Sequence, residues 1–175
     1  MTEVITRAAG RLRRALVRGD DDPSRVGGHA AALAAYAVYT AAWTAAVRRS
    51  GRGLPERTEP WDLALTSVAA FRLSRLVSKG AVTRPLRAPF TEYRGPQAAP
   101  AEVHEEPRGG ASHTVGELVS CPFCLGVWTV TTLTAAGLLW PRATRTVTSA
   151  LTALAGADTL QLAYSALTEK VAGEE

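Results

Sequence analysis

Residues 118–140 read LVSCPFCLGVWTVTTLTAAGLLW and contain no charged side chain. As a helix that rises about 1.5 Å per residue, this stretch would be roughly 34 Å long, which is enough to cross a bilayer. We therefore predict that it spans a membrane.

The same stretch holds the only cysteines of the chain, Cys121 and Cys124, with Pro122 between them. Proline is favoured in the first turn of a helix, so one possibility is a helix that begins near Cys121. The other possibility is a helix that begins at Thr114, with Thr114 and Glu117 as a capping box and a kink at Pro122. In both cases the two sulfur atoms lie on one helix face.

Three further stretches are long and mostly apolar, and with the first they predict an all-α membrane bundle of four spans. Strand signals are poor, because no sustained alternation of apolar and polar residues is bounded by hairpin turns. By hydropathy alone the stretch 61–78 is a poor span, and an amphipathic helix that lies on the membrane surface is the alternative for it. The predicted spans are residues 27–47, 61–78, 118–140 and 146–167.

Two segments lie outside the spans. Residues 1–26 are predicted to be a basic tail that forms a short amphipathic helix, because six arginines alternate with apolar residues at helical spacing. Such a tail suits a membrane surface, and a solvated tail fits equally well. Residues 27–175 would then form the membrane domain. Residues 80–117, with their prolines and glycines, are predicted to be a long loop without regular structure.

The distribution of basic residues predicts the orientation. With the N-terminus in the cytoplasm, the inner segments hold about twice as many Lys and Arg as the outer loops, as the positive-inside rule requires. Trp43, Trp61 and Trp140 then all fall at the outer interface, as in an aromatic belt. The prediction is a multi-pass protein of the cytoplasmic membrane. Cys121 and Cys124 would lie near the cytoplasmic face, where a stable disulfide is not expected.

The charge pattern indicates which partners to expect. The formal net charge is +4, and the arginines cluster between apolar runs, which suits anionic lipid headgroups. No recognition motif or aromatic-interleaved basic patch indicates nucleic-acid binding. We expect the partners to be the lipid bilayer, its anionic headgroups and other membrane proteins. Because the mean hydropathy is close to zero, a soluble helical bundle is the alternative.

Several motifs occur between Trp61 and Tyr164. They are Phe71-Arg72-Leu73-Ser74-Arg75-Leu76, Arg84-Pro85-Leu86-Arg87, Gly116-Glu117-Leu118-x-x-Cys121-Pro122-Phe123-Cys124-Leu125-Gly126-x-Trp128, Pro141-Arg142-Ala143-Thr144-Arg145 and Asp158-x-Leu160-Gln161-x-Ala163-Tyr164. Together they resemble a family of small, uncharacterised bacterial membrane proteins. The resemblance covers over half of the chain and implies the membrane class, but no reaction.

The Cys-Pro-Phe-Cys unit suggests two kinds of chemistry. It has the form of the glutaredoxin active site, although glutaredoxins place it after a strand of a βαβ unit, which is not predicted here. A membrane-embedded thiol-disulfide oxidoreductase is the alternative function, with Cys121 attacking and Cys124 resolving. Two thiolates with His104 and His113 would suit zinc or copper, but the histidine spacing matches no zinc finger, and we expect no cofactor.

Asp158 lies within a predicted span, where an ionisable group is costly without a partner. Arg72 and Arg75, toward the end of another span, are candidate partners. Such a pair would fix the register of two helices or belong to a proton or ion path, and we favour the structural role. The sequence thus predicts an integral membrane protein with a structural or interaction role, and leaves open whether it is an enzyme.

Overall fold

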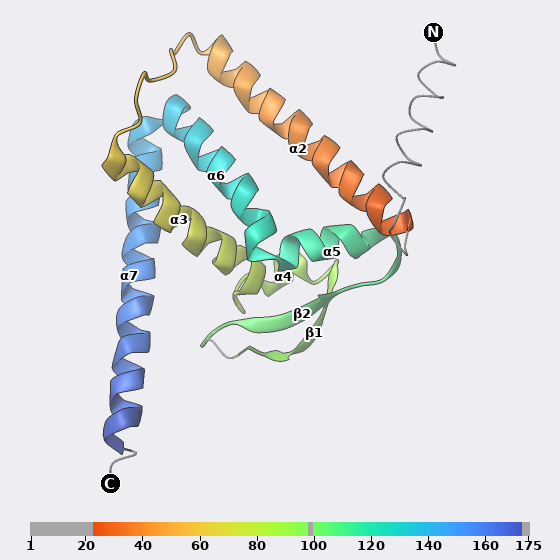
Figure 1. Cartoon of the computed structure of the whole chain (residues 1–175), viewed down its shortest axis with the longest axis vertical. Helices are drawn as coiled ribbons and strands as arrows, with labels where there is room; N and C mark the ends of the chain where they lie inside the picture. Colours follow the sequence, from red (N-terminus) through yellow and green to blue (C-terminus); the bar gives the residue numbers. More distant parts are fainter. Residues whose placement is uncertain (1–22, 98–99, 173–175) are drawn as a thin grey trace.

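The computed structural model describes residues 23–97 and 100–172. Most of them lie in long helices that pack side by side, with a two-stranded sheet at one end (Figure 1). Residues 1–22 of the predicted basic tail lie outside the described residues, and residues 23–26 begin the first helix. In chain order the elements are α2 (Pro23–Arg49), α3 (Pro60–Lys79), α4 (Arg84–Arg87), β1 (Thr91–Pro96), β2 (Val103–Pro107), η1 (Gly110–Ser112), α5 (His113–Ser120), α6 (Pro122–Leu139) and α7 (Pro141–Ala172).

Helix α6 packs against α2, α3 and α7, and α3 also packs against α7. Where α3, α6 and α7 meet, the buried residues are Ala69, Ala70 and Leu133, with Leu151 packed against them. Alanine lets helix axes approach closely, but it buries little apolar area. The helices are therefore closely packed around a small core.

Hydroxyl and aromatic contacts join α2 to α6. The hydroxyl oxygen of Tyr36 lies 2.7 Å from that of Thr131, and the hydroxyl oxygen of Tyr39 lies 2.5 Å from that of Thr132. Both tyrosine rings also pack on Trp128, with centroid distances of 5.2 and 4.9 Å. The face of α2 that carries Tyr36 and Tyr39 is thus turned toward α6.

The chain bends at Cys121, so residues 118–140 do not form the single spanning helix that the sequence predicts. Cys121 is extended (φ −100°, ψ 112°), and α6 begins at Pro122, which is the helical position that proline favours. Of the two geometries considered, the helix start near Cys121 is the one observed. The preceding helix, α5, is separate and begins at His113, and the capping box predicted at Thr114 does not form.

Two further predictions are wrong, because residues 80–117 are not a structureless loop and the protein is not all-α. β1 and β2 form an antiparallel hairpin with an irregularity between Tyr93 and Gly95. Gly95 has φ of 134°, a conformation that glycine adopts readily and other residues avoid. The hairpin packs against α5. Its strands, TEYRGP and VHEEP, contain few apolar residues, so they lack the alternation that indicates a strand.

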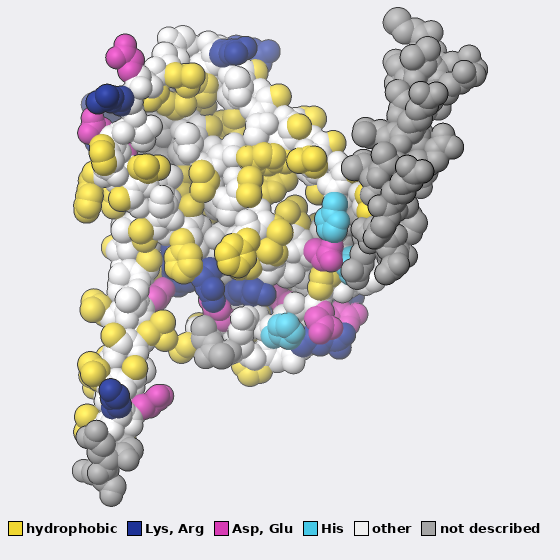
Figure 2. All heavy atoms as spheres, viewed as in Figure 1, with side chains coloured by type: hydrophobic (Ala, Val, Ile, Leu, Met, Phe, Trp, Pro, Cys, Tyr) yellow, Lys and Arg dark blue, Asp and Glu magenta, His cyan; other side chains and the backbone are white. Residues whose placement is uncertain are grey.

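Two helical segments, Val26–Arg49 and Pro122–Leu139, are long and apolar enough to cross a membrane. Only 6% and 17% of the residues in their most apolar 18-residue stretches are buried, so both stretches are largely exposed. Apolar side chains are spread over the visible surface of the helices, and much of the charge gathers beneath them, around the hairpin (Figure 2). α3 and α7 do not pass the same test of length and composition, and α7 extends well beyond the predicted 146–167.

Tryptophans gather at the end of the bundle opposite the hairpin. The rings of Trp43 and Trp140 pack edge to face, with centroids 6.5 Å apart. Arg52, in the connection between α2 and α3, donates a hydrogen bond to the carbonyl of Leu139 at the same end. Trp61, at the start of α3, is exposed. The two ends of the bundle thus differ, because the packed tryptophans lie at one end and the hairpin with its carboxylates lies at the other.

The seating of α5 on the hairpin can be tested at Gly116. A Cβ atom at this position would lie 2.5 Å from the carbonyl oxygen of Phe90 and 2.9 Å from Cβ of Pro107. We expect Gly116→Ala to lower the free energy of unfolding by about 1–3 kcal/mol, as overpacking usually does, measured by thermal unfolding of the purified protein in mild detergent. The control is Gly126→Ala in α6, where a Cβ meets nothing within 4 Å. Equal losses in both variants would contradict the tight contact.

Candidate functional site

The charged end of the bundle is the candidate site, and we call it the polar layer. It consists of the last turns of α3, the hairpin with α4, α5, and the first turn of α6 (Figure 1). Ion pairs join these elements, and the two cysteines lie among them.

The most deeply buried charges in the polar layer are Arg87 and Glu105, whose side chains are 1% and 2% exposed. Arg87 Nε donates to Glu105 Oε2 over 2.5 Å. The same guanidinium donates to the carbonyl oxygens of Val77 and Gly80, the latter over 3.0 Å, and to Thr83 Oγ1 over 2.8 Å. Arg87 therefore occupies carbonyl groups that the end of α3 leaves without helical partners.

The outer edge of this pair carries Arg84. Its Nε lies 3.6 Å from Glu105 Oε1, and its guanidinium sits 4.5 Å from the ring centre of Tyr93. A guanidinium at that distance from an aromatic face is a favourable cation–π contact. Glu105 thus has one arginine on each oxygen, and β1 contributes an aromatic cover.

The ionisable residues singled out in the predicted spans have separate partners. Arg72 Nε lies 2.7 Å from Asp158 Oδ2, although the geometry does not meet the criteria of a hydrogen bond. Arg75 donates twice to Glu102, over 2.9 and 2.6 Å, in the bidentate arrangement that suits a guanidinium and a carboxylate. The structure therefore brings Asp158 together with Arg72, and ties Arg75 to the hairpin instead.

A second ion pair joins the same two helices at the other end. Arg145 of α7 lies 3.6 Å from Asp62 of α3. In this pair α3 carries the carboxylate and α7 the arginine, the reverse of Arg72 and Asp158. A shift of one helix along the other would therefore bring like charges closer. Both pairs are partly exposed, so each contributes modestly to stability. The arrangement sets the register of α3 against α7.

Glu117 of α5 lies between two histidines. Its Oε2 is 3.2 Å from His29 Nε2 on α2 and 3.5 Å from His113 Nδ1 one turn earlier. This oxygen has no solvent contact and no hydrogen bond of good geometry. The carboxylate lies where α5 passes the start of α2, and protonation of either histidine would strengthen the contact.

Cys121 and Cys124 are both reduced and lie at the start of α6. The amide of Cys124 donates to Cys121 Sγ over 3.3 Å, so the thiol acts as the N-cap of the helix. Burial alone would raise the pKa of the Cys121 thiol. Hydrogen bonds from the Cys124 thiol and amide and from the Phe123 amide, together with the charge of Lys79, outweigh burial and lower the pKa. The arrangement favours a reactive thiolate at Cys121.

The histidines considered as metal ligands are dispersed. His104 lies on β2 with its Nε2 3.9 Å from Glu106, whereas His113 begins α5 beside Glu117. Within residues 23–97 and 100–172, no group of three or more His, Cys, Asp or Glu side chains is arranged to hold a metal ion.

Sequence reasoning missed the partners that the hairpin supplies. Arg87, Glu102 and Glu105 lie within residues 80–117, which are predicted to be a loop, so no partners are predicted for them. The signal available was the repeated basic spacing Arg84 and Arg87 after a helix, with glutamates about twenty residues later. The spacing identifies ion pairs only once the hairpin is known, because the hairpin brings the arginines and the glutamates together.

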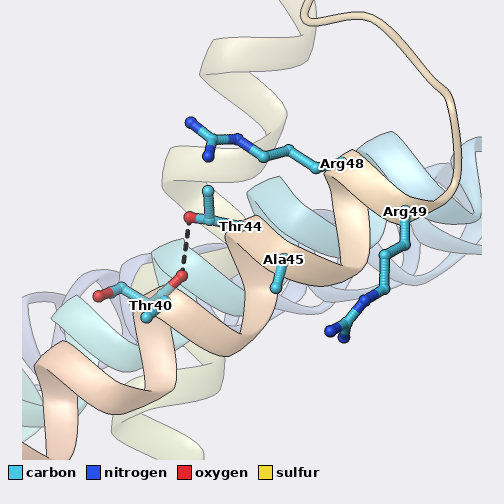
Figure 3. A pocket seen from close by; sticks show the side chains of 6 residues that line it. Thr40, Thr44, Ala45, Arg48 and Arg49 are labelled. Atoms are coloured by element: carbon cyan, nitrogen blue, oxygen red, sulfur yellow. Dashed lines mark hydrogen bonds between the residues drawn. The ribbon is translucent and has the colours of Figure 1, made fainter.

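A shallow hollow runs along the outward face of α2, lined by Thr40, Ala41, Thr44, Ala45, Arg48 and Arg49 (Figure 3). Thr44 Oγ1 donates to the carbonyl of Thr40 over 2.8 Å, and Thr40 Oγ1 donates to the carbonyl of Ala37 over 2.9 Å, so both hydroxyl groups bond to the backbone of α2 itself. Every lining residue belongs to α2, and the lining contains no carboxylate, histidine or cysteine. The hollow is a smooth helix face, and a catalytic role does not fit it.

These features define a class, a small helical protein with exposed apolar helices and one polar end built on a hairpin. Residues 65–164 match the model of the family described as "Protein of unknown function (DUF1360)". This match covers more than half of the chain, and the chain belongs to that family. The matched residues fall inside the segment between Trp61 and Tyr164 that carries the resemblance seen in the sequence.

The chain is also similar to the Sporulation protein YjcA of Bacillus subtilis (strain 168). The two are 38% identical over 69 residues, which cover 38% of this chain and 58% of the relative. The chain therefore spans less than two thirds of the length of that protein. No solved structure matches the chain. The protein thus belongs to an uncharacterised bacterial family.

Replacing Arg87 tests whether the buried pair organises the polar layer. Arg87→Ala would leave Glu105 buried without its main partner, and we expect a loss of about 3–5 kcal/mol in the free energy of unfolding. The readout is the thermal unfolding midpoint in mild detergent, together with the rate of proteolysis within the hairpin. The matched control is Arg94→Ala, whose partners Glu92 and Glu106 are exposed and which should cost less than about 1 kcal/mol. A hairpin as protease-resistant in Arg87→Ala as in Arg94→Ala would refute the organising role.

Proposed function

We propose that this protein is a four-span integral protein of the cytoplasmic membrane, with its N-terminus and polar layer in the cytoplasm and a structural or interaction role. The spans are α2, α3, α6 and the first part of α7, so the residues of the predicted span 146–167 that follow Asp158 would lie on the cytoplasmic side instead. The observation that carries the proposal is the exposure of the two most apolar helices, which bury only 6% and 17% of their apolar windows. Water is a poor solvent for such surfaces, and lipid is a good one.

The lengths of the helices suit this arrangement. α6, with 18 residues, is about 27 Å long, close to the thickness of the hydrocarbon core. The two ends of α6 also differ. Trp140 follows its last residue, and Cys121, beside the polar layer, precedes its first. Tryptophan favours the interface, and the packing of Trp43 against Trp140 supports an aromatic belt at the outer side.

The orientation follows from the basic residues. The end of the bundle opposite the hairpin carries six of the twenty Lys and Arg, whereas the polar layer, the lower half of α3 and the flanking tails hold the other fourteen. The six are Arg48, Arg49, Arg52, Arg57, Arg142 and Arg145. The positive-inside rule then favours a cytoplasmic polar layer. Basic residues at the inner surface also attract anionic lipid headgroups, which we propose as partners.

A structural or interaction role fits the pairing of charges in the polar layer. Arg72, Arg75, Arg87 and Arg94 each have a carboxylate partner within 3 Å, and the hairpin supplies three of the four partners. Charges paired in this way hold elements together. A cytoplasmic hairpin held rigidly at the membrane surface would suit contact with another membrane protein.

Membrane embedding and orientation can be tested together. The wild-type protein should stay in the pellet after vesicles are washed at alkaline pH, and should leave it only with detergent. In a cysteine-free background, we would restore Cys121 or introduce Gly53→Cys, a loop position where a Cβ meets nothing within 4 Å. A membrane-impermeant maleimide should label Cys121 from the cytoplasmic side only, and Gly53→Cys from the opposite side only. Release by alkaline washing, or labelling of both positions from one side, would refute the proposal.

A second candidate function, thiol-disulfide exchange, is favoured by the hydrogen bond from the Cys124 amide to Cys121 Sγ. In this reaction the Cys121 thiolate attacks a substrate disulfide and releases one substrate thiolate, which takes up a proton. The Cys124 thiolate, having lost its proton to solvent, then displaces the second substrate thiolate. The substrate disulfide is reduced to two thiols, and the cysteine pair is oxidised to a disulfide.

This candidate predicts a difference between two variants. Because the pKa of Cys121 is lowered, its thiolate share near pH 7 exceeds that of an ordinary thiol, so Cys124→Ser should still be alkylated rapidly there. Cys124→Ser should also trap a mixed disulfide with a small disulfide such as oxidised glutathione, detected by mass spectrometry, whereas Cys121→Ser should not. Slow alkylation of both variants until the protein is denatured would leave the cysteines a structural role only.

A further inference from the structure

Helix α7 is much longer than the helix it follows. α6 has 18 residues and α7 has 32, so at about 1.5 Å per residue α7 is roughly 20 Å longer. The two helices run in opposite directions from the turn at Trp140. The second half of α7 therefore passes the level of Cys121 and projects beyond the hairpin (Figure 1). Every residue from 159 to 172 is exposed.

The projecting half of α7 has one large apolar face. Successive spacings of four, three and four residues place these side chains in a single stripe along the helix. The same spacing continues backward to Ala157 and Ala153, which are also exposed. The stripe consists of Leu160, Tyr164, Leu167 and Val171, which are 73%, 70%, 64% and 67% exposed.

This stripe faces away from the rest of the protein. The side of α7 that contacts the bundle holds Thr148 and Ala155, which are buried, and Thr152, whose Oγ1 donates to the carbonyl of Leu65 over 3.2 Å. Asp158, which pairs with Arg72, lies on this side too. At 100° per residue, the stripe lies on the opposite side of the helix from these contacts. A partner could therefore cover it without displacing any element of the bundle.

We propose that the projecting halves of α7 from two copies of this chain pair as a parallel two-stranded coiled coil on the cytoplasmic side of the membrane. This inference rests on the proposed membrane topology. In heptad terms, Leu160 and Leu167 occupy d positions, and Tyr164 and Val171 occupy a positions. Leucine at d with a β-branched residue at a favours two parallel strands, and Val171 supplies such a residue.

Membrane insertion favours a second copy over an unrelated partner. Copies inserted in one bilayer share the same orientation, so their projecting helices are parallel and begin at the same height. Confinement to the membrane also raises the effective concentration of one copy near another. A projecting helix without any packed partner is marginal in water, so pairing would also stabilise the helix itself.

The area available on the stripe comes close to the lower limit for a specific dimer. Four large side chains per copy, each about two-thirds exposed, would bury on the order of 1,000 Å² between two helices, near the lower limit for a specific interface. Ala153 and Ala157 extend the contact into the part of α7 that the membrane would surround. Small residues four apart let helices approach closely in lipid, and large apolar residues suit the aqueous part.

The charges on α7 tolerate this pairing. Asp158 and Glu169 occupy b and f positions, on the outside of a two-stranded coil, so two copies bring no like carboxylates together. Lys170 flanks the stripe at a g position, where it can lie over the partner helix. Leu162 also occupies an f position and is 52% exposed, so it offers a matched control for the stripe leucines.

The first experiment compares dimerisation of three proteins by sedimentation in mild detergent. The wild-type chain should be a dimer. The double variant Leu160→Gln/Leu167→Gln should raise the dimer dissociation constant about tenfold or more, because it removes both d-position leucines. Leu162→Gln should leave it unchanged. All three should keep the same thermal unfolding midpoint of the bundle when monomeric, which excludes misfolding as the cause. A wild-type monomer, or equal weakening by Leu162→Gln, would overturn the proposal.

The second experiment measures cross-linking in native vesicles. In a background with Cys121→Ser and Cys124→Ser, Val171→Cys and Leu167→Cys should form an intermolecular disulfide when an oxidant is added. Glu169→Cys, at an outward f position, should not. Cross-links from Leu167→Cys or Val171→Cys to a different protein only, or quenching of a label there by lipid-borne quenchers, would assign the stripe to another partner or to the bilayer surface and overturn the proposal.

The two proposals fail in distinguishable ways. A protein that stays in alkaline-washed membranes but sediments as a monomer and gives no cross-link retains the membrane topology and loses the coiled coil. A protein that washes out of vesicles loses the membrane topology, whatever its oligomeric state.

Discussion

The buried pair of Arg87 and Glu105 is the interaction on which the arrangement of the polar layer depends. A helix ends with carbonyl groups that have no helical partner. At the end of α3, the guanidinium of Arg87 donates hydrogen bonds to the carbonyls of Val77 and Gly80. A buried guanidinium needs a counter-charge, which Glu105 brings from the hairpin. The end of the helix and the position of β2 are therefore set by one residue. Arg75 and Glu102 repeat the connection one turn earlier in α3.

The helices pack closely, but they bury little apolar area among themselves, so the polar layer adds contacts that the small core does not supply. The buried cluster between α3, α6 and α7 consists largely of alanine, which gives close approach with little apolar burial. On the proposed topology, lipid takes the place of a large core by solvating the outward faces. What lipid does not supply is register, because apolar faces slide on one another with little penalty. The ion pairs of α3 with α7, and the hydroxyl contacts of α2 with α6, supply it.

The sequence predicted those features that local chemistry controls. Uncharged length predicted the apolar helices, and Pro122 predicted the start of α6. Tyr36 and Tyr39 pack on Trp128, which gives α2 one packing face toward α6. The hairpin escaped prediction because its strands are stabilised by charges that find their partners only in the folded chain. Arg75 has its own carboxylate there, so the partner of Asp158 is Arg72, a choice that spacing alone did not make.

The low hydropathy of α3 and α7 also comes from charged residues whose partners lie on another element of the folded chain. The hydropathy of a single helix counts each charged residue as a cost of entering lipid, because it takes no account of an opposite charge on a neighbouring helix. Asp62, Arg72 and Asp158 all meet opposite charges across the contact between α3 and α7. Two helices that each carry such charges are poor spans separately and acceptable ones as a pair. The pair would then enter the membrane together with α6, and the residues that disqualify each helix alone are those that align it with its neighbour.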